Sequence, residues 1–241
     1  MANQVGMGVV GAGAIGIRGA LSHLCMDDVR DAVRVAAICD PVDRRAAAAA
    51  ERFGVPKAYL SFEELLDDPD VDAVTICTPI GLHYEQGLKA IEKGKHIHFN
   101  KTMTTTVAEA DELIRRAEKA GVKIIASPGM MLHPHNQRIR KAVLAGELGR
   151  LCWAATGTSG VGDYHMNEEF RTGEDILTDV DPSWYYRKPG GFPSTTSRCT
   201  ACTISRVFLV QQKKLLRSQV WWCRSESTLA KASPVTWMIQ P

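Results

Sequence analysis

Short hydrophobic runs alternate with amphipathic stretches through the first half of the chain. The runs are rich in Val and Ile, as buried strands are, and lie at residues 4–10, 33–39, 71–79, 96–101 and 122–129. The stretches between them have apolar residues at helical spacing and lie at residues 17–24, 43–54, 61–68, 84–94 and 106–121. Strands that alternate with helices predict an α/β fold with a parallel, doubly wound sheet of the Rossmann type.

Capping residues mark several of the expected helix boundaries. Ser61 is followed three residues later by Glu64, which is the spacing of a capping box. Gly54, Gly94 and Gly121 stand where three helical patterns stop, and glycine is the residue that most readily ends a helix in the left-handed conformation. We therefore expect helices to begin and end at these positions.

A glycine-rich turn follows the first expected strand. Gly11, Gly13 and Gly16 satisfy the spacing G-x-G-x-x-G, where the glycines permit a tight turn, the approach of a pyrophosphate and close packing of helix on strand. The helix that starts there offers free N–H groups to an anion. The turn predicts a dinucleotide site formed by Gly11, Ala12, Gly13, Ala14, Ile15 and Gly16.

An acidic residue ends the second expected strand. Asp40 lies 24 residues beyond Gly16, near the spacing of the acid that binds the adenosine ribose. A carboxylate there favours NAD, because it would repel the 2′-phosphate of NADP. Arg44 and Arg45 leave NADP open, and the alternative is that they form the solvated first turn of the next helix.

Three polar clusters fall at the carboxyl ends of expected strands, where a doubly wound sheet binds its ligand. They are Asp40-Pro41, Thr78-Pro79 followed by His83, and Asn100-Lys101-Thr102.

Six motifs follow one another in order between residues 5 and 191. They are "GVVGAGAIG", "CDP", "TPIGLH", "NKT", "LAGELGRL" and "DPSWYYRKPGG". In this order they resemble the glucose–fructose oxidoreductase and inositol dehydrogenase (Gfo/Idh/MocA) family of NAD(P)-dependent oxidoreductases. The resemblance implies hydride transfer between a nicotinamide and a sugar- or polyol-like hydroxyl, and a homo-oligomer built through the sheet of a second domain.

The resemblance also assigns roles to single residues. Lys101 aligns with the lysine of the family's Glu-Lys-Pro motif, where an ammonium stabilises charge on the reacting oxygen. Thr78, Pro79, His83 and Asn100 would line the cofactor pocket, and His83 is expected to shape it rather than to transfer protons. The family's proline follows a cis peptide. Because a non-proline cis bond costs about 2.5–4 kcal/mol, we expect Lys101 and Thr102 to be joined by a trans bond.

The expected domains are a Rossmann domain at residues 1–127 and the start of an α/β substrate domain at residues 128–191, which leaves the second, α+β domain incomplete. "LGRLCWAATGTS" resembles its first strand. After "DPSWYYRKPGG" the family continues into a helix that carries a proton-transfer histidine or tyrosine. This chain continues with "FPSTTSRCTAC" instead.

The composition changes after Gly191. Residues 192–241 contain no glycine or aspartate, and they carry seven Lys or Arg against the single acid Glu226. Their net charge is therefore +6, and because the whole chain has a net charge of +2, residues 1–191 have a net charge of about −4. One interpretation is a basic nucleic-acid-binding arm. The other is a reading-frame shift near Phe192, which makes residues 192–241 an aberrant, poorly ordered tail. Restoring the frame turns the positions of Trp222 and Cys223 into valine, and permits a tyrosine where Thr200 stands.

Other features exclude whole classes of protein. No apolar run is long enough to span a bilayer and the first residues do not resemble a signal peptide, so we expect a soluble, cytoplasmic protein with no membrane partner. The seven cysteines are scattered and suit reduced thiols. The pair Cys199–Cys202 stands alone, and neither His96 with His98 nor His133 with His135 has a third ligand nearby, so we expect no metal.

Three functional hypotheses follow. The first is an NAD(P)-dependent oxidoreductase that acts on a small sugar- or polyol-like substrate. The second is a catalytically inactive, truncated dinucleotide-binding module, because the chain lacks the proton-transfer motif. Such a chain would bind NAD weakly or not at all and show little dehydrogenase activity. The third, which we favour least, is a Rossmann domain with a basic arm that binds nucleic acid. We expect no nucleic-acid partner.

Overall fold

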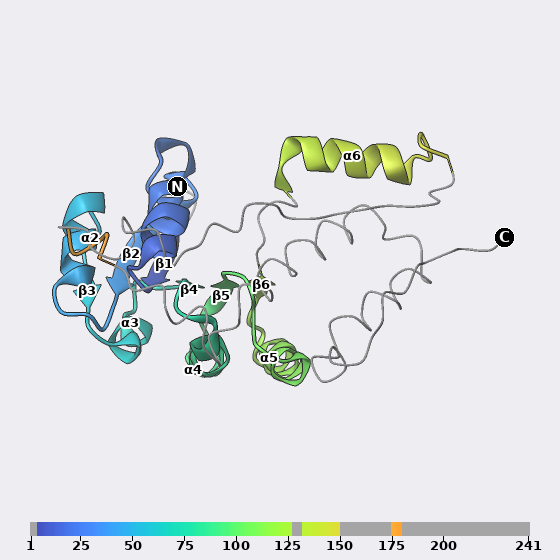
Figure 1. Cartoon of the computed structure of the whole chain (residues 1–241). Helices are drawn as coiled ribbons and strands as arrows, with labels where there is room; N and C mark the ends of the chain where they lie inside the picture. Colours follow the sequence, from blue (N-terminus) through green and yellow to red (C-terminus); the bar gives the residue numbers. More distant parts are fainter. Residues whose placement is uncertain (1–3, 127–131, 150–174, 180–241) are drawn as a thin grey trace, which may run out of the picture. The chain divides into compact units, whose positions relative to one another are not determined.

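A six-stranded parallel sheet forms the centre of the N-terminal domain (Figure 1). The structure is a computed structural model that describes residues 4–126, 132–149 and 175–179. The strands are β1 (Val5–Val10), β2 (Val33–Cys39), β3 (Ala58–Tyr59), β4 (Ala73–Ile76), β5 (His96–Phe99) and β6 (Ile124–Ala126). Their order is β3-β2-β1-β4-β5-β6, and every neighbouring pair is parallel. The predicted doubly wound α/β sheet is confirmed.

Helices connect the strands where the amphipathic pattern places them. They are η1 (Gly16–Leu21, a π-helical segment), α1 (Ser22–Leu24), η2 (Asp27–Val29, a short 3₁₀ helix), α2 (Arg45–Phe53), α3 (Phe62–Asp67), η3 (Ile80–Leu82, also 3₁₀), α4 (His83–Glu92), α5 (Val107–Ala120) and α6 (Pro134–Leu144). The two-residue strand β3 and the helix α6 are additions to the predicted elements.

The expected caps are present. The Ser61 hydroxyl accepts the N–H of Glu64 at 3.1 Å, and the Glu64 carboxylate accepts the N–H of Ser61 at 3.2 Å, so the capping box closes in both directions. Gly54 and Gly121 end α2 and α5 with φ of 67° and 70°, as predicted from their positions.

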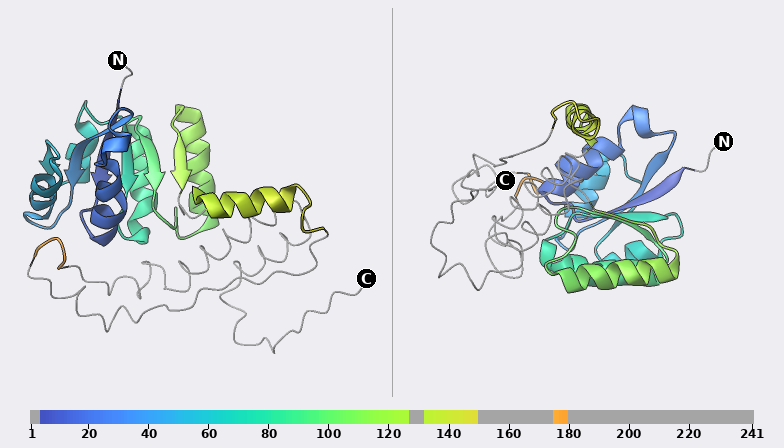
Figure 2. Two further views of the ribbon diagram at one scale, coloured as in Figure 1. Left: turned by 90° about the horizontal axis from the view of Figure 1, so that it is seen from above. Right: turned by 90° about the vertical axis from the view of Figure 1, so that its right-hand side faces the viewer.

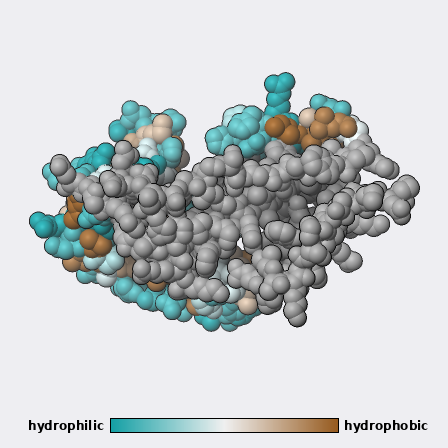
Figure 3. Space-filling view, in the orientation of Figure 1, coloured by the Kyte–Doolittle hydropathy of each residue, from teal (hydrophilic) through white to brown (hydrophobic). Residues whose placement is uncertain are grey.

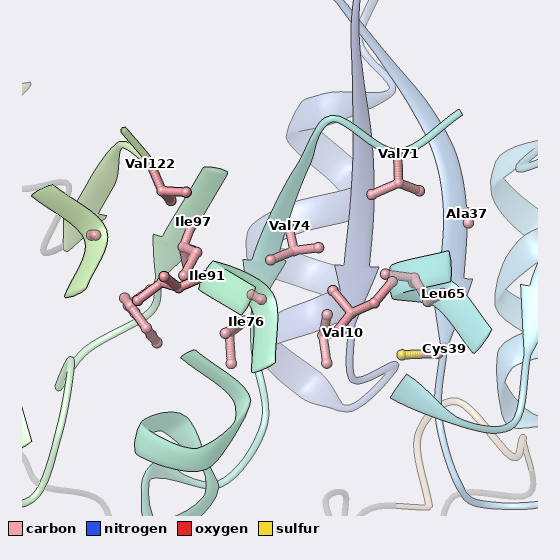
Figure 4. Close-up of a cluster of buried hydrophobic side chains, with 14 of the residues drawn as sticks. Val10, Ala37, Cys39, Leu65, Val71, Val74, Ile76, Ile91, Ile97 and Val122 are labelled. Carbon is pink, nitrogen blue, oxygen red and sulfur yellow. The ribbon is translucent and has the colours of Figure 1, made fainter. Parts of the chain in front are cut away.

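The sheet lies between two layers of helices (Figure 2). Helices α3, α4 and α5 cover one face, and Figure 4 shows apolar side chains of the sheet and of these helices that pack together there. Helices η1, α1 and α2 cover part of the other face, where Val9, Leu21 and Ile38 are fully buried. Replacing a fully buried leucine such as Leu113 by alanine costs about 2–5 kcal/mol in comparable cores, so these two clusters hold the domain together.

The chain divides into two compact units, and residues 132–149 belong to the second. There α6 begins with Pro134 at its first turn, a position where the missing N–H of proline costs nothing. Ile139 and Leu144 of this helix are 45% and 36% exposed, and Figure 3 shows a hydrophobic patch over α6.

Several sequence predictions fall outside the described residues. These are almost all of the expected strand at residues 148–159, the loop at residues 181–191, the expected frame shift and tail at residues 192–241, and the Cys199–Cys202 pair. No helix in the described part of the chain is long and apolar enough to cross a bilayer.

Candidate functional site

The glycine-rich turn joins β1 to η1 in the conformation that its spacing predicts. Gly11 has a φ of 96°, a backbone angle that residues other than glycine rarely adopt. Its N–H donates to the carbonyl oxygen of Cys39 at 2.9 Å. A Cβ on Gly16 would stand 1.8 Å from the Gly11 carbonyl oxygen, whereas a Cβ on Gly13 would meet nothing within 4 Å. The turn is therefore tightly closed at Gly16 and open above Gly13.

Helical structure begins at Ala14, directly after this open space. The first N–H groups of a helix have no partner within the helix, so they face outward at the N-terminus. Ile15 is 42% exposed at the same place. The backbone thus presents donors and a positive helix end beside Gly13, the geometry that binds a phosphate.

Asp40 sits at the carboxyl end of β2, next to the turn. Its Oδ2 accepts the N–H of Ala12 at 2.8 Å and its Oδ1 accepts the N–H of Val42 at 2.9 Å. The residue is only 5% exposed. Because a carboxylate offers about four lone-pair sites, Asp40 keeps acceptor capacity beyond these two bonds.

The two arginines after Asp40 lie in different surroundings. The side chain of Arg44 is 84% exposed and contacts only Asp43, at 3.4 Å, among the ion pairs of the described residues. The side chain of Arg45 is 14% exposed and donates to the carbonyl oxygens of Ile176 and Asp179. The hypothesis of a solvated first turn therefore describes Arg44 and is wrong for Arg45.

Thr78 follows β4 and touches the turn. A Cβ on Gly11 would lie 3.2 Å from the Thr78 methyl, so these two residues are close neighbours. The Thr78 hydroxyl donates to Oε1 of Gln86 at 2.5 Å, and Pro79 accepts the N–H of Leu82 at 2.9 Å. These bonds fix the loop after β4 to the start of α4, and Thr78 lies beside the glycine-rich turn.

His83 connects the loop after β4 with the loop after β5. It is 1% exposed, its Nε2 lies 2.9 Å from the Thr78 carbonyl oxygen, and its Nδ1 lies 2.8 Å from the Thr102 carbonyl oxygen. Burial lowers the pKa of His83 below 6.5, and the two carbonyls oppose that shift. The contacts are those of a buried residue that fixes two loops.

Lys101 lies at the end of β5, where its N–H donates to the Asn100 side-chain oxygen at 2.8 Å. No hydrogen bond or ion pair of its ammonium is found among the described residues. The hydroxyl of the adjacent Thr102 is buried without a partner in the same part of the chain. The Lys101 ammonium is therefore the group at this strand end that is left for a ligand, because the Thr102 hydroxyl is withdrawn from solvent.

The expected trans bond between Lys101 and Thr102 is wrong, since the structure has this peptide cis. Hydrogen bonds of the folded chain fix the backbone groups on either side of this bond. The His83 ring holds the Thr102 carbonyl on one side, and the Asn100 amide holds the Lys101 N–H on the other.

Several of the predicted site residues thus form one row at the carboxyl ends of the strands. The Asp40 carboxylate accepts the N–H of Ala12, the Thr78 methyl lies beside Gly11, and His83 joins Thr78 to Thr102. The row crosses the ends of β2, β1, β4 and β5 in their order in the sheet, and includes the point where the strand order reverses. The sequence signals missed the cis bond, the Thr78–Gln86 bond and the contacts of Arg45.

The paired histidines have other partners. Nδ1 of His98 lies 2.8 Å from the Thr75 hydroxyl, and Nδ1 of His96 accepts the N–H of Lys123 at 3.0 Å. The rings of His133 and His135 lie 5.4 Å apart. In residues 4–126, 132–149 and 175–179, no group of three or more His, Cys, Asp or Glu is placed to hold a metal ion.

A parallel sheet of this order, with a glycine-rich turn at its switch point, defines a protein of the dinucleotide-binding α/β class. Residues 5–128 match the family described as "Oxidoreductase family, NAD-binding Rossmann fold" (GFO_IDH_MocA). The chain belongs to this Gfo/Idh/MocA family of oxidoreductases, as its motifs indicate.

Individual relatives agree with this assignment. The chain is 39% identical over 106 residues to 1,5-anhydro-D-fructose reductase of Ensifer adhaerens, which covers 44% of this chain and 32% of that protein. It is 30% identical over 144 residues to myo-inositol 2-dehydrogenase of Thermotoga maritima, covering 60% and 42%. A crystal structure of KijD10, a 3-ketoreductase from Actinomadura kijaniata in complex with TDP-benzene and NADP, aligns with a TM-score of 0.55 at 30% identity, covering 60% and 44%.

In all three comparisons the chain matches less than half of the relative's own length. The family match at residues 5–128 covers the dinucleotide-binding fold. The substrates named for these relatives belong to proteins that are longer than the part shared with this chain.

Proposed function

We propose that the protein is an NAD(P)-dependent oxidoreductase that transfers hydride between a nicotinamide and a sugar- or polyol-like hydroxyl. The observation that carries this proposal is the row of neighbouring residues that runs from Asp40 through the glycine-rich turn and Thr78 to Thr102 at the carboxyl ends of the strands. The names of the reductases and dehydrogenases to which the chain is similar support the substrate class.

The residues of the row fit a dinucleotide. The open space at Gly13 accommodates a pyrophosphate, and the start of the helix supplies N–H donors to it. Asp40 would accept hydrogen bonds from the adenosine ribose, and Thr78, Pro79 and Asn100 would form the wall toward the nicotinamide, on loops that His83 fixes. The bound nicotinamide supplies the hydride acceptor or donor, and the protein's own groups orient it.

Lys101 is the residue that we propose to act on the substrate. Its ammonium has no partner among the described residues and follows β5 at the ligand-binding edge. A cation there stabilises the negative charge that develops on the hydroxyl oxygen as its carbon loses hydride. Lys101 is therefore the catalytic group that the N-terminal domain contributes.

The arginine contacts favour NAD over NADP. Arg45 is engaged by two backbone carbonyls and Asp40, which leaves Arg44 as the exposed cation near the ribose position. Asp40 would repel a 2′-phosphate, so NADP would need Arg44 to outweigh that repulsion. Because the similar protein KijD10 was solved with NADP, the binding experiment below compares both cofactors.

A second candidate is a catalytically inactive dinucleotide-binding module. It is favoured by residues 192–241, which lack the family's Pro-Leu-x-Asp segment and the histidine or tyrosine that follows it. In that case the 241-residue chain would bind the cofactor without turnover. The substrate domain, the homo-oligomer and the frame shift remain predictions from the sequence.

Two measurements test these proposals. Thermal unfolding of the full chain with NAD or NADP at millimolar concentration reports cofactor binding, since a ligand at 100 times its Kd stabilises by about 2.7 kcal/mol. If the second candidate is right, restoring the reading frame by one base near codon 192 should then give polyol-dependent NAD reduction, which we expect to be absent or weak in the present chain. No stabilisation by either cofactor would contradict a dinucleotide site, and equal activity in both frames would contradict the frame shift.

A further inference from the structure

A short segment from far along the chain packs beside the start of α2. Residues 175–179 lie within the same compact unit as the Rossmann domain, and Figure 1 shows them in orange next to α2. Arg45 Nε donates to the Ile176 carbonyl at 3.2 Å, and Arg45 Nη2 donates to the Asp179 carbonyl at 2.6 Å. The guanidinium of Arg45 thus binds two residues that lie more than 130 positions further along the chain.

The segment is held by apolar contact as well. Leu177 is 5% exposed and belongs to the buried cluster of η1 and α2. Asp175 shapes the turn, since its carboxylate accepts the N–H of Leu177 at 3.0 Å and its carbonyl accepts the N–H of Thr178 at 2.9 Å. Arg52 lies 3.7 Å from Asp175 in a half-exposed ion pair. The segment is thus an ordered part of this domain.

Arg45 also faces the acid at the end of β2. Its Nη1 lies 3.8 Å from Oδ1 of Asp40, and both side chains are largely withdrawn from water, at 14% and 7% exposed. A guanidinium so placed depends on protein acceptors, because removing a partner of a buried charge leaves it uncompensated. Asp40 is the only charged partner of Arg45 among the described residues. The carbonyl oxygens of Ile176 and Asp179 accept hydrogen bonds from the other N–H groups of the guanidinium.

We propose that Arg45 is a positioning residue for the adenosine end of the cofactor site. It orients the Asp40 carboxylate toward the ribose hydroxyls and ties the Asp175–Asp179 segment beside them. The N–H groups of Ala12 and Val42 hold one oxygen each, and Arg45 adds the third contact, which opposes rotation of the carboxylate. The inference rests on the proposed dinucleotide site and adds to it a residue that does not touch the cofactor.

The first arm of the test examines the segment without cofactor. Hydrogen exchange is measured on the full chain for wild type, Arg45→Met and Arg45→Lys, with Arg115→Met as control, since Arg115 is an exposed arginine on α5 that pairs with Glu112. We expect the amides of Leu177, Thr178 and Asp179 to exchange at least about tenfold faster in Arg45→Met and unchanged in the control. Wild-type protection in Arg45→Met would overturn the inference.

The second arm compares NAD with its analogue that lacks the adenosine 2′-hydroxyl. A hydrogen bond to a charged group contributes about 1.5–3 kcal/mol, so wild type should prefer NAD by about 10-fold or more. In Arg45→Met this preference should fall to about 3-fold or less. A general loss of stability would lower the affinity for both ligands equally and leave the ratio of the two affinities as in wild type. An unchanged ratio in Arg45→Met would therefore overturn the inference. Arg45→Lys should keep part of the ratio, because it keeps a charge near Asp40, and should lose the segment's protection.

The two failures are distinguishable. Wild-type protein that binds neither NAD nor the analogue would overturn the proposed dinucleotide site, and this inference with it. Wild-type protein that prefers NAD, together with an Arg45→Met variant that has the same preference, would overturn the inference alone. If Arg45→Met does not fold, Arg45→Lys is subject to the same criterion for protection.

Discussion

The Nδ1 atom of His83 lies 2.8 Å from the carbonyl oxygen of Thr102, and the Nε2 atom of the same ring lies 2.9 Å from the carbonyl oxygen of Thr78. A neutral imidazole has one N–H, so it donates to one of these oxygens at a time. The ring nevertheless fills the space between two strand-end loops and is packed 5.8 Å from the ring of Phe99. His83 thereby sets the distance between the Thr78 loop and the residue after Lys101.

Replacing His83 should loosen both loops. We expect His83→Gln to lower the free energy of unfolding by about 1–3 kcal/mol, because the narrower, non-aromatic side chain loses the packing on Phe99 and cannot lie against both buried carbonyls at once. Thermal or urea unfolding measures the change. His23→Gln, at an exposed position of α1, is the control, and an equal effect of both substitutions would contradict the bridging role.

Stability should fall with acid in a window set by buried histidines. Burial lowers the pKa of His83 and of His98 below 6.5, so the unfolded chain takes up protons at a pH where the folded chain does not. The stabilisation is therefore complete above pH 6.5 and is lost as the pH falls toward the lower folded values. Each histidine contributes up to about 1.4 kcal/mol per pH unit in this window.

Unfolding free energies of wild type and His83→Gln at several pH values below 6.5 measure this slope. The substitution should flatten the slope without abolishing it, because His98 still titrates. A slope that is unchanged by His83→Gln would show that the ring is not buried in its neutral form.

Two glycines of the same turn should respond differently to alanine. Gly16→Ala would place a Cβ 1.8 Å from the Gly11 carbonyl oxygen, so the turn must distort and the protein should lose about 1–3 kcal/mol of stability. Gly13→Ala meets nothing within 4 Å and should leave the melting temperature of the free protein nearly unchanged.

The new methyl of Gly13→Ala would instead fill the space proposed for the pyrophosphate. NAD affinity should then fall by about tenfold or more, measured by titration calorimetry or by the thermal shift. Gly54→Ala, at a left-handed helix end away from the turn, controls for a general effect of a methyl group, because it should cost stability and not affinity. Full NAD binding by Gly13→Ala would place the cofactor elsewhere.

Lys101 should matter for turnover more than for cofactor binding. In the frame-restored protein, Lys101→Met should lower the rate of hydride transfer by about 10²–10⁴-fold, which is the usual contribution of a positioned acid–base group. NAD affinity should change by less than about threefold. Lys119→Met, in the last turn of α5, is the matched control, and a variant at Lys101 with wild-type turnover would exclude its catalytic role.

Local patterns determined most of the sheet and its helices. Val33–Cys39 and the Ser61–Glu64 capping box were predictable because hydrophobic runs and caps act over a few residues. The short β3 has two residues, too few for any periodicity, and was missed for that reason.

The site divides in the same way. The spacing of Gly11, Gly13 and Gly16 and the acid at Asp40 identify a dinucleotide-binding turn, because each glycine answers a local requirement of the backbone. The sequence by itself also places Lys101 at a strand end and marks the change of composition after Gly191.

Only the tertiary structure decided which groups meet. The His83 bridge to Thr102 and the fork of Arg45 on Ile176 and Asp179 depend on contacts between residues 19 to 134 positions apart, and the cis bond before Thr102 has no signal in the local sequence. Such contacts leave no local periodicity, since their geometry arises when strands and loops pack together. For this reason Arg44 and Arg45, adjacent and chemically alike in the sequence, have different surroundings in the folded protein: one is exposed to solvent and the other holds a distant segment beside Asp40.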